Sequence, residues 1–260
     1  MFAALFGELL PRPRAEAVEG TSQDAYALFY ARSAAMGWLT PAVEGASAGL
    51  WGMNDAAAAA DAEPPASRVA FFQVVVTEPS FGKLLPIQPF LACVSDVMAR
   101  LGTLRLEAFQ VLLPERGADE DARFASPSGM RAARILLDSG TWFAGCDPQL
   151  RVPVRVTLDG GPDPSIRTAA PAILRWVQEV RQDVFACDSL ALADDDHLIL
   201  RPIPFDSGIF RTEHHRITFR GTLAEWSLDA LGWLAGFLAD GASRHGFSGR
   251  LILTAGRTAA

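Results

Sequence analysis

Two adjacent histidines mark the part of the sequence whose residue types most suggest chemistry. They lie in the stretch TEHHR, residues 212–216, beside Glu213 and Arg216, and they are half of the four histidines of the chain. Imidazole and carboxylate groups serve as metal ligands and as proton carriers. The stretch therefore raises the question of a metal site or a catalytic site.

The spacing of these histidines favours a structural role. The residues that follow them read as a strand, in which successive side chains point to opposite faces of a sheet. His214 is then expected on the face that carries Arg216, and His215 on the face that carries Ile217. Because side chains that diverge in this way do not converge on one metal ion, we expect a strand that begins at these histidines.

A metal-assisted hydrolase is the alternative interpretation. It requires His197, Glu213 and His214 to meet across a sheet edge, together with the turn DDDH that begins at Asp194. Carboxylate and imidazole ligands suit zinc and related ions. Three consecutive aspartates are also typical of a solvated turn, since Asp hydrogen-bonds its own backbone there. We expect no cofactor, because neither a Walker A run nor a GxGxxG run is present.

Arginines fall on one face of two expected strands. In LRVPVRVTL, residues 150–158, Arg151 and Arg155 alternate with valines, and in HHRITFRG, residues 214–221, Arg216 and Arg220 share one face. Guanidinium groups on an open sheet face can bind carboxylate or phosphate through two hydrogen bonds each. The same groups can instead pair with acidic side chains across the strands and keep the face soluble. The sequence leaves both interpretations open.

Composition narrows the range of partners. The net charge of −7 makes general affinity for nucleic acid or anionic membranes unexpected. Stacking aromatic residues are scarce on the expected arginine face, which argues against RNA, although an RNA-binding module stays an alternative. No run reaches the about 18 apolar residues of a membrane span. Three widely spaced cysteines indicate a reduced, cytoplasmic protein. The alanine and arginine usage is typical of a GC-rich bacterial genome and carries no functional information.

The elements that position these residues repeat one pattern after residue 67. Strands are expected at 68–78, 104–114, 133–143, 150–158, 184–192, 197–203, 214–221 and 249–255, and helices at 89–102, 171–182 and 222–246. The last helix is expected to begin at a capping box formed by Thr222 and Glu225. Strand–helix–strand units at comparable spacing predict an α+β fold with repeated βαβ or ferredoxin-like units and helices on one sheet face.

The first 67 residues are expected to form a helical appendage that ends in a linker. Apolar residues recur at helical spacing over residues 2–9, the stretch PRPR ends this helix, and a second helix is expected at 23–38. Residues 54–67, NDAAAAADAEPPAS, read as a linker to a second domain at 68–260. If the appendage does not pack on its own chain, it exposes apolar side chains that can contact a partner. These side chains are Phe2, Phe6, Tyr26, Tyr30 and Trp38.

Function follows less directly from the sequence than fold does. Because no acid–base pair and no activated nucleophile stand together, we expect a non-catalytic binding or assembly protein that engages a protein partner or another copy of itself. The alternatives are the metal-assisted hydrolase and the anionic-ligand or RNA-binding module on the arginine face. The fold class alone does not choose among them.

Overall fold

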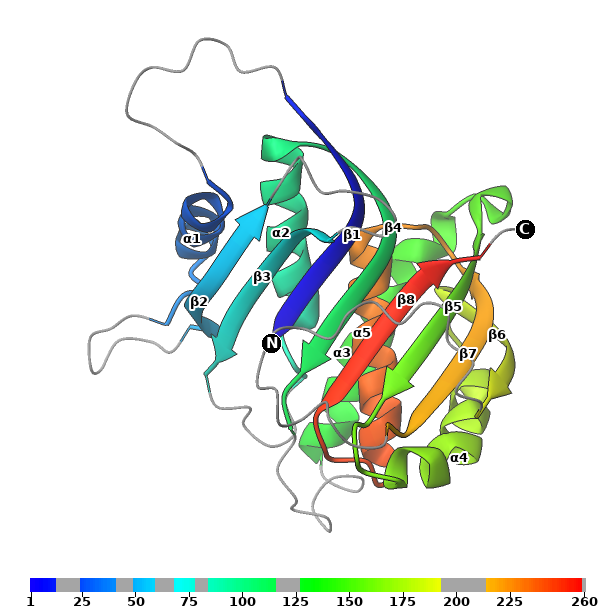
Figure 1. The fold of residues 1–260 in the computed structure, drawn as a ribbon. Helices are drawn as coiled ribbons and strands as arrows, with labels where there is room; N and C mark the ends of the chain where they lie inside the picture. Colours follow the sequence, from blue (N-terminus) through cyan, green and yellow to red (C-terminus); the bar gives the residue numbers. More distant parts are fainter. Residues whose placement is uncertain are drawn as a thin grey trace, which may run out of the picture. The chain divides into compact units, whose positions relative to one another are not determined.

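The computed structural model describes residues 1–12, 24–40, 49–58, 68–77, 84–115, 127–192 and 214–258. Over these ranges, eight strands and five α-helices alternate along the chain (Figure 1). The strand pairs with a defined register are antiparallel. The expected α+β class is therefore confirmed. None of the helices in these ranges has the length and apolar character needed to cross a membrane.

The chain groups into two compact units. Unit 1 comprises Met1–Glu78 and Pro89–Phe109, and unit 2 comprises Pro79–Gln88 and Gln110–Ala260. The strand order is β2-β3-β1-β4 in unit 1 and β8-β5-β7-β6 in unit 2, where the last residues of β4 also belong. The expected division of the chain at residue 67 stays a prediction.

The elements of unit 1 are two helices and four strands. Along the chain they are β1 (Phe2–Pro11), α1 (Ala25–Ala35), β2 (Trp51–Ala58), β3 (Arg68–Val76), α2 (Ile87–Leu101) and β4 (Gly102–Leu113). Figure 1 shows α2 behind β3 and β1. The side chains between helices and strands form an aromatic core, in which Phe29 of α1 packs against Trp51, Phe72 and Phe90 at ring-centroid distances of 6.4, 5.2 and 5.8 Å.

Residues 2–11 form a strand, so the helix expected there is wrong. β1 pairs with β3 and places Phe2 opposite Gln73 and Leu5 opposite Ala70. Residues 2–6 are all buried, which means that both faces of this strand are covered. A short apolar run has no period that separates such a strand from a buried helix, and only the pairing decides. The expected linker at 54–67 likewise begins as a strand, because β2 extends to Ala58.

The elements of unit 2 continue the alternation of strands and helices. They are α3 (Pro127–Gly140), two short 3₁₀ turns (Thr141–Gly145 and Pro148–Leu150), β5 (Val152–Asp159), α4 (Ser165–Glu179), β6 (Phe185–Ala191), β7 (Arg216–Leu223), α5 (Leu228–Arg244) and β8 (Leu251–Arg257). Figure 1 shows α5 behind the strands of this unit. Val154, Val156 and Leu158 of β5 are buried, as the alternation in the sequence predicts.

The period of the last helix predicts Glu225, Asp229 and Asp240 on a solvent side, opposite its apolar residues. In the structure α5 is buried around almost its whole circumference, so this is wrong for Asp240. Asp240 is 7% exposed, and its Oδ2 accepts a 2.6 Å hydrogen bond from Arg244 Nε. The helix also begins later than expected. Ser227 is the N-cap and accepts from the backbone N–H of Ala230 at 3.1 Å, whereas Thr222 belongs to β7.

Residues 133–143 form the end of α3 and a 3₁₀ turn, so the strand expected there is wrong. Leu136 is buried, and its carbonyl accepts a 2.7 Å hydrogen bond from Trp233 Nε1 of α5. Arg134 is exposed on α3, where its Nε lies 3.7 Å from Asp138 Oδ2, one helical turn away. Arg134 is therefore not part of a sheet face. The apolar run around Leu136 is too short for its period to separate helix from strand.

Candidate functional site

The side of the unit 2 sheet opposite to Val154, Val156 and Leu158 carries polar side chains, and we call it the polar face. Its residues alternate with the buried ones along two paired strands, which is the period-two geometry of a sheet. It comprises Arg155, Thr157 and Asp159 of β5 and Arg216, Thr218 and Arg220 of β7. Three of the four arginines that the sequence singled out thus lie on one face.

Two of these arginines stand directly opposite each other. Arg155 of β5 pairs in register with Arg220 of β7. Directly opposed like charges destabilise a sheet, because their Cβ atoms are only about 5 Å apart. Burial lowers the pKa of the half-buried Arg155 guanidinium, and the charge of Arg220 lowers that pKa further. The pair therefore concentrates positive charge at one point of the polar face.

The neighbours of the arginine pair have small side chains. Gly256 of β8 stands beside Arg155, and Ser189 of β6 stands beside Arg220. Two positions further along each strand, on the same face and toward Asp159, lie Thr157 and Thr218, whose Oγ1 atoms are 3.0 Å apart. Gly256, Thr157 and Thr218 are buried, whereas Ser189 is exposed, so the face is solvent-accessible on the β6 side of the pair.

A second row of hydroxyl and amide groups extends from the threonine pair. Thr254 of β8 pairs in register with Thr157, and its Oγ1 accepts a 3.1 Å hydrogen bond from Gln110 Nε2 at the end of β4. Gln110 is buried, and its Oε1 has no hydrogen-bond partner within the described ranges. The polar face therefore continues from the threonine pair into a partly buried row of hydroxyl and amide groups.

Asp159 organises the other end of the polar face. Its carboxylate accepts hydrogen bonds from Arg216 Nε at 2.9 Å and from the backbone N–H of Gly161 at 2.8 Å, and it lies 3.0 Å from His214 Nδ1. The Asp159 side chain is 11% exposed. Arg216 is 14% exposed and is held by this carboxylate at the start of β7. It therefore stabilises the end of the strand pair.

Asp159 is the residue of this cluster that sequence reasoning missed. It opens the run DGGPD, residues 159–163, which reads as a turn, and it also has the same strand parity as Arg155 and Thr157. That parity is the signal that places it on the polar face. His215, which follows His214 in the chain, makes backbone hydrogen bonds with Gly160 and Gly161.

Arg151 does not join the arginine pair. It precedes β5, and its Nη2 donates a 2.9 Å hydrogen bond to the backbone carbonyl of Asp183, before β6. This contact fixes the start of β5 next to the loop that follows α4. Arg151 and Arg216 therefore have contacts that hold strand ends, and Arg155 and Arg220 are the two arginines that the register sets opposite each other.

The metal-site hypothesis falls mostly on residues that the structure does not describe. His197 and Glu213, and the aspartates of 194–196, lie outside the described residues. Of the expected ligands only His214 is described, and its ring contacts Asp159. Among the residues with defined positions, no group of three histidine, cysteine or acidic side chains is placed to hold a metal ion.

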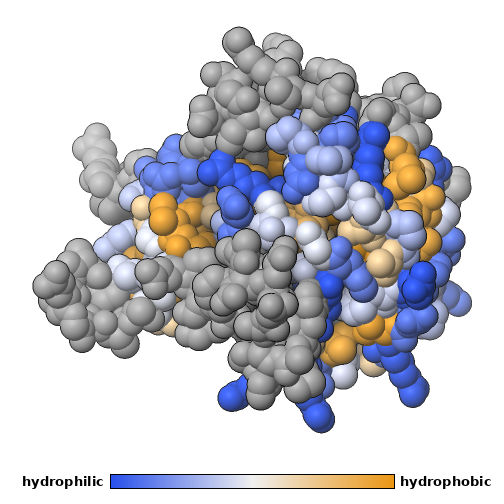
Figure 2. Space-filling model, turned by 90° about the horizontal axis from the view of Figure 1, so that it is seen from below, coloured by the Kyte–Doolittle hydropathy of each residue, from blue (hydrophilic) through white to orange (hydrophobic). Residues whose placement is uncertain are grey.

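The side chains expected to contact a partner divide into two groups. Phe2 and Phe6 are 2% and 5% exposed in β1, so they are core residues of unit 1 and are not available to a partner. Trp38 is half-buried, with its ring 5.4 Å from that of Trp51. Tyr26 and Tyr30 of α1 are 39% and 50% exposed. On the visible described residues, Figure 2 shows hydrophobic atoms in separate patches among hydrophilic ones.

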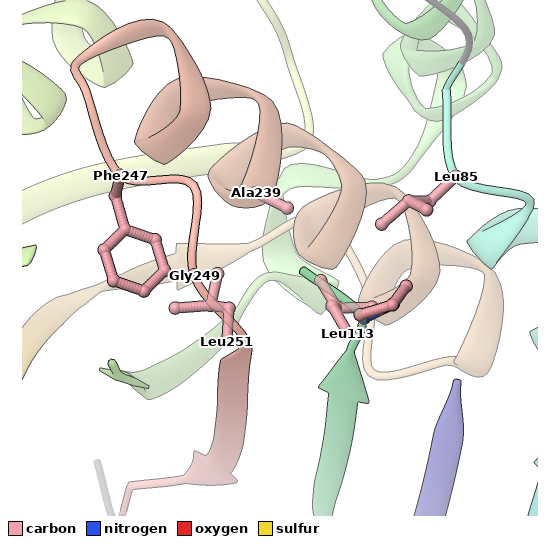
Figure 3. Close-up of a pocket in the computed structure, with 7 residues that line it drawn as sticks. Leu85, Leu113, Ala239, Phe247, Gly249 and Leu251 are labelled. Carbon is pink, nitrogen blue, oxygen red and sulfur yellow. The ribbon is translucent and has the colours of Figure 1, made fainter. Parts of the chain in front are cut away.

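Unit 2 also contains a small apolar cavity. Leu85, Leu113, Ala239, Phe247 and Leu251 contribute to its lining, and Figure 3 shows the last turns of α5 beside the ends of β4 and β8 there. Its volume is about 10 Å³, which is room for one water molecule at most. A cavity of this size and polarity is a packing defect rather than a ligand site.

The chain was compared with protein families, with curated proteins and with solved structures. No family model, no curated protein and no solved structure matches the chain.

Proposed function

We propose that the chain is a non-catalytic binding protein that holds an anionic group of a protein partner between Arg155 and Arg220. The observation that carries the proposal is the register of β5 and β7, which sets these two arginines directly opposite each other. A folded protein that keeps like charges opposed gives up stability at that point. An anion that bonds to both guanidinium groups offsets this cost.

The chemistry of the polar face supports binding rather than bond breaking. Arginine stays protonated at physiological pH, so it contributes charge and hydrogen bonds and does not transfer protons. The carboxylate of Asp159 already bonds to Arg216 and to the Gly161 backbone. The groups that follow the arginine pair on this face are the Thr157 and Thr218 hydroxyls, which are buried and lie within hydrogen-bond distance of each other.

The proposed scaffold consists of two ferredoxin-like units. Each unit runs strand, helix, strand, strand, helix, strand, from β1 to β4 and from β5 to β8. In both, the fourth strand lies beside the first, the first beside the third and the third beside the second. This order is the split βαβ arrangement, which leaves one sheet face without helices. The arginines lie on the face of the second unit opposite to Val154, Val156 and Leu158, where Arg220 is exposed and Arg155 is half-buried.

An acidic peptide tests the proposal. Octaglutamate, titrated into the full chain at low and high NaCl, is expected to bind and to weaken as salt screens the exposed charges. Isothermal titration calorimetry gives the Kd, and NMR signals of the arginine Nε–H groups report which side chains respond. Exchange of Arg220 for Gln is expected to weaken binding at least about fivefold, since half of the opposed charge is lost.

A matched variant separates the site from general charge. Arg134→Gln removes the same charge from the exposed surface of α3 in the same unit, and it is expected to bind octaglutamate as the native chain does. Circular dichroism verifies that each variant is folded. Equal loss of affinity in both variants, or binding that is indifferent to salt, would overturn the proposal.

A further inference from the structure

Helix α1 of unit 1 has an exposed side without charged residues, and we call it the tyrosine face. Its exposed positions are Tyr26, Ala27, Tyr30, Ala31, Ala34 and Ala35. The single charged residue of α1 is Arg32, which lies outside this face and bonds to Asp96 of α2 at 2.7 Å. The opposite side of the helix packs on unit 1 through Leu28 and Phe29. A helix that is apolar around its whole circumference is typically covered on every side.

The composition of the tyrosine face is that of an interface. The exposed positions of α2, in the same unit, include Asp96 and Arg100, as is usual for a helix that faces water. Tyr26 and Tyr30 are 39% and 50% exposed, and they are the two tyrosines of the chain. Tyrosine is enriched at interfaces because its ring adds apolar area while its hydroxyl stays in water. Figure 1 shows α1 at the outer side of unit 1, beside β2.

The tyrosine face contains both a ridge and the groove that fits it. Side chains four positions apart form rows along a helix, and helices pack by setting the rows of one into the grooves of the other. One row is Tyr26, Tyr30 and Ala34, and the row beside it is Ala27, Ala31 and Ala35. The first row is raised by its two tyrosines, whereas the second is low because it consists of alanines. A second copy of the same helix therefore offers a groove for each tyrosine.

One antiparallel register fits both tyrosines at once. If Tyr30 of one copy lies on Ala27 of the other, Tyr26 lies on Ala31, because both pairs are centred between Leu28 and Phe29. Each contact then occurs twice about a two-fold axis, which is the symmetry of most dimers. The absence of charge fits this symmetry as well, since a two-fold axis brings like charges together. These properties favour a second copy over a different protein.

We infer that two copies of the chain form a dimer through their tyrosine faces. This dimer is independent of the anion-binding function, because it uses other residues, in unit 1. An aromatic side chain presents about 150–250 Å² for burial, so two tyrosines at 39% and 50% exposure, with the alanines, offer roughly 300 Å² per copy. The total of roughly 600 Å² lies below the about 1,200–2,000 Å² of stable complexes, so the dimer is weak and reversible.

Labelling of the full chain with 3-fluorotyrosine tests the dimer directly. Because the two tyrosines of the chain both lie on the tyrosine face, each of the two ¹⁹F NMR signals reports on the contact. Both signals are expected to shift as the concentration rises from about 10 μM to about 1 mM, while sedimentation velocity shows the mass rising from monomer toward dimer. A mass that rises while neither ¹⁹F signal shifts would locate the contact elsewhere and overturn the inference.

A matched pair of variants assigns the dimer to this face. Ala31→Glu puts a charge opposite Tyr26 in both halves of the dimer, and it is expected to weaken dimerisation at least about tenfold. Ala99→Glu makes the same exchange at an exposed position of α2 and is expected to dimerise as the native chain does. Both variants replace an exposed alanine by a good helix former, so circular dichroism is expected to show an unchanged fold. Equal weakening in both would contradict the inference.

A mixture of two further variants tests the antiparallel register. Ala27→Glu and Tyr30→Lys are each expected to be monomeric when alone. An equal mixture is expected to restore a dimer, because the new carboxylate of one copy faces the new ammonium group of the other, and one native contact between Tyr30 and Ala27 remains. A mixture that stays monomeric would overturn this pairing.

A native chain that is monomeric at every concentration also overturns the inference, and the ¹⁹F signals then identify what occupies the face. Signals protected from a soluble paramagnetic agent would show that the same chain covers the tyrosine face. Signals that remain accessible to the agent would leave the face to a different protein.

Discussion

Replacing Arg220 by glutamine is expected to stabilise the ligand-free protein, which is the opposite of what most substitutions do. Arg220 is exposed and faces Arg155 across the β5–β7 pair. Like charges opposed on a sheet cost about 0.2–1 kcal/mol, and screening by solvent around an exposed side chain favours the lower half of that range. The free energy of unfolding is therefore expected to rise by about 0.5 kcal/mol, or by roughly 1–2 °C in Tm.

Thermal and urea unfolding at several salt concentrations measure this change. At about 1 M NaCl the Debye length falls to about 3 Å, so the gain in stability is expected to vanish there. Arg134→Gln is the matched control, because it removes an attraction to Asp138 in place of a repulsion and is expected to leave stability unchanged or slightly lower. A loss of stability in Arg220→Gln at low salt, or a gain that does not depend on salt, would refute the argument that the two charges oppose each other.

Three further predictions concern the interior of unit 2 and its titration. Trp233→Phe is expected to lower the free energy of unfolding by about 2 kcal/mol in urea titrations, because it deletes the hydrogen bond to the Leu136 carbonyl and leaves a cavity around a fully buried side chain; a change below about 0.5 kcal/mol would contradict this packing. Asp159→Asn is expected to cost about 2 kcal/mol, since Arg216 is mostly buried and loses its counter-charge, and the loss is expected in the absence of any ligand. Burial and two neighbouring arginines lower the pKa of His245, so the contribution of neutral His245 to the free energy of unfolding is present above the ordinary histidine pKa and is lost as pH falls through the lowered value. The free energy of unfolding, measured from pH 7 to 5, is therefore expected to fall less in His245→Asn than in the native chain. Equal slopes in the two proteins would contradict this.

Local patterns in the sequence predicted most of unit 2. The alternation in β5, the amphipathic pattern of α4 and the apolar strand β8 all depend on residues close together in the chain. β5 and β8 are found within two residues of their expected bounds, whereas α4 begins at Ser165, six residues before the expected start, and has Pro171 inside it. The same kind of pattern failed for β1 and for α3. Both contain apolar runs too short to fix a period, and their burial depends on what packs against them, such as β3 against Phe2.

The candidate site was only half visible in the sequence. Strand parity placed Arg155, Arg216 and Arg220 on one face, and it could have placed Asp159 there as well. Parity does not say which residues face each other across two strands. Arg216 opposite Asp159 makes an ion pair, whereas Arg220 opposite Arg155 makes a concentration of positive charge. The difference between an arginine beside a carboxylate and an arginine beside another arginine therefore arises from register.

The sequence by itself determined which side chains share a face, because the period of a strand or helix is a property of neighbouring residues. The tertiary structure alone decided which strands pair, and in which register, because these contacts join residues far apart in the chain. Thr157 and Thr218 lie 61 positions apart and yet bond side by side. The free energy that selects such a pairing comes from burial of the whole helix layer against the sheet, and no local pattern contains it.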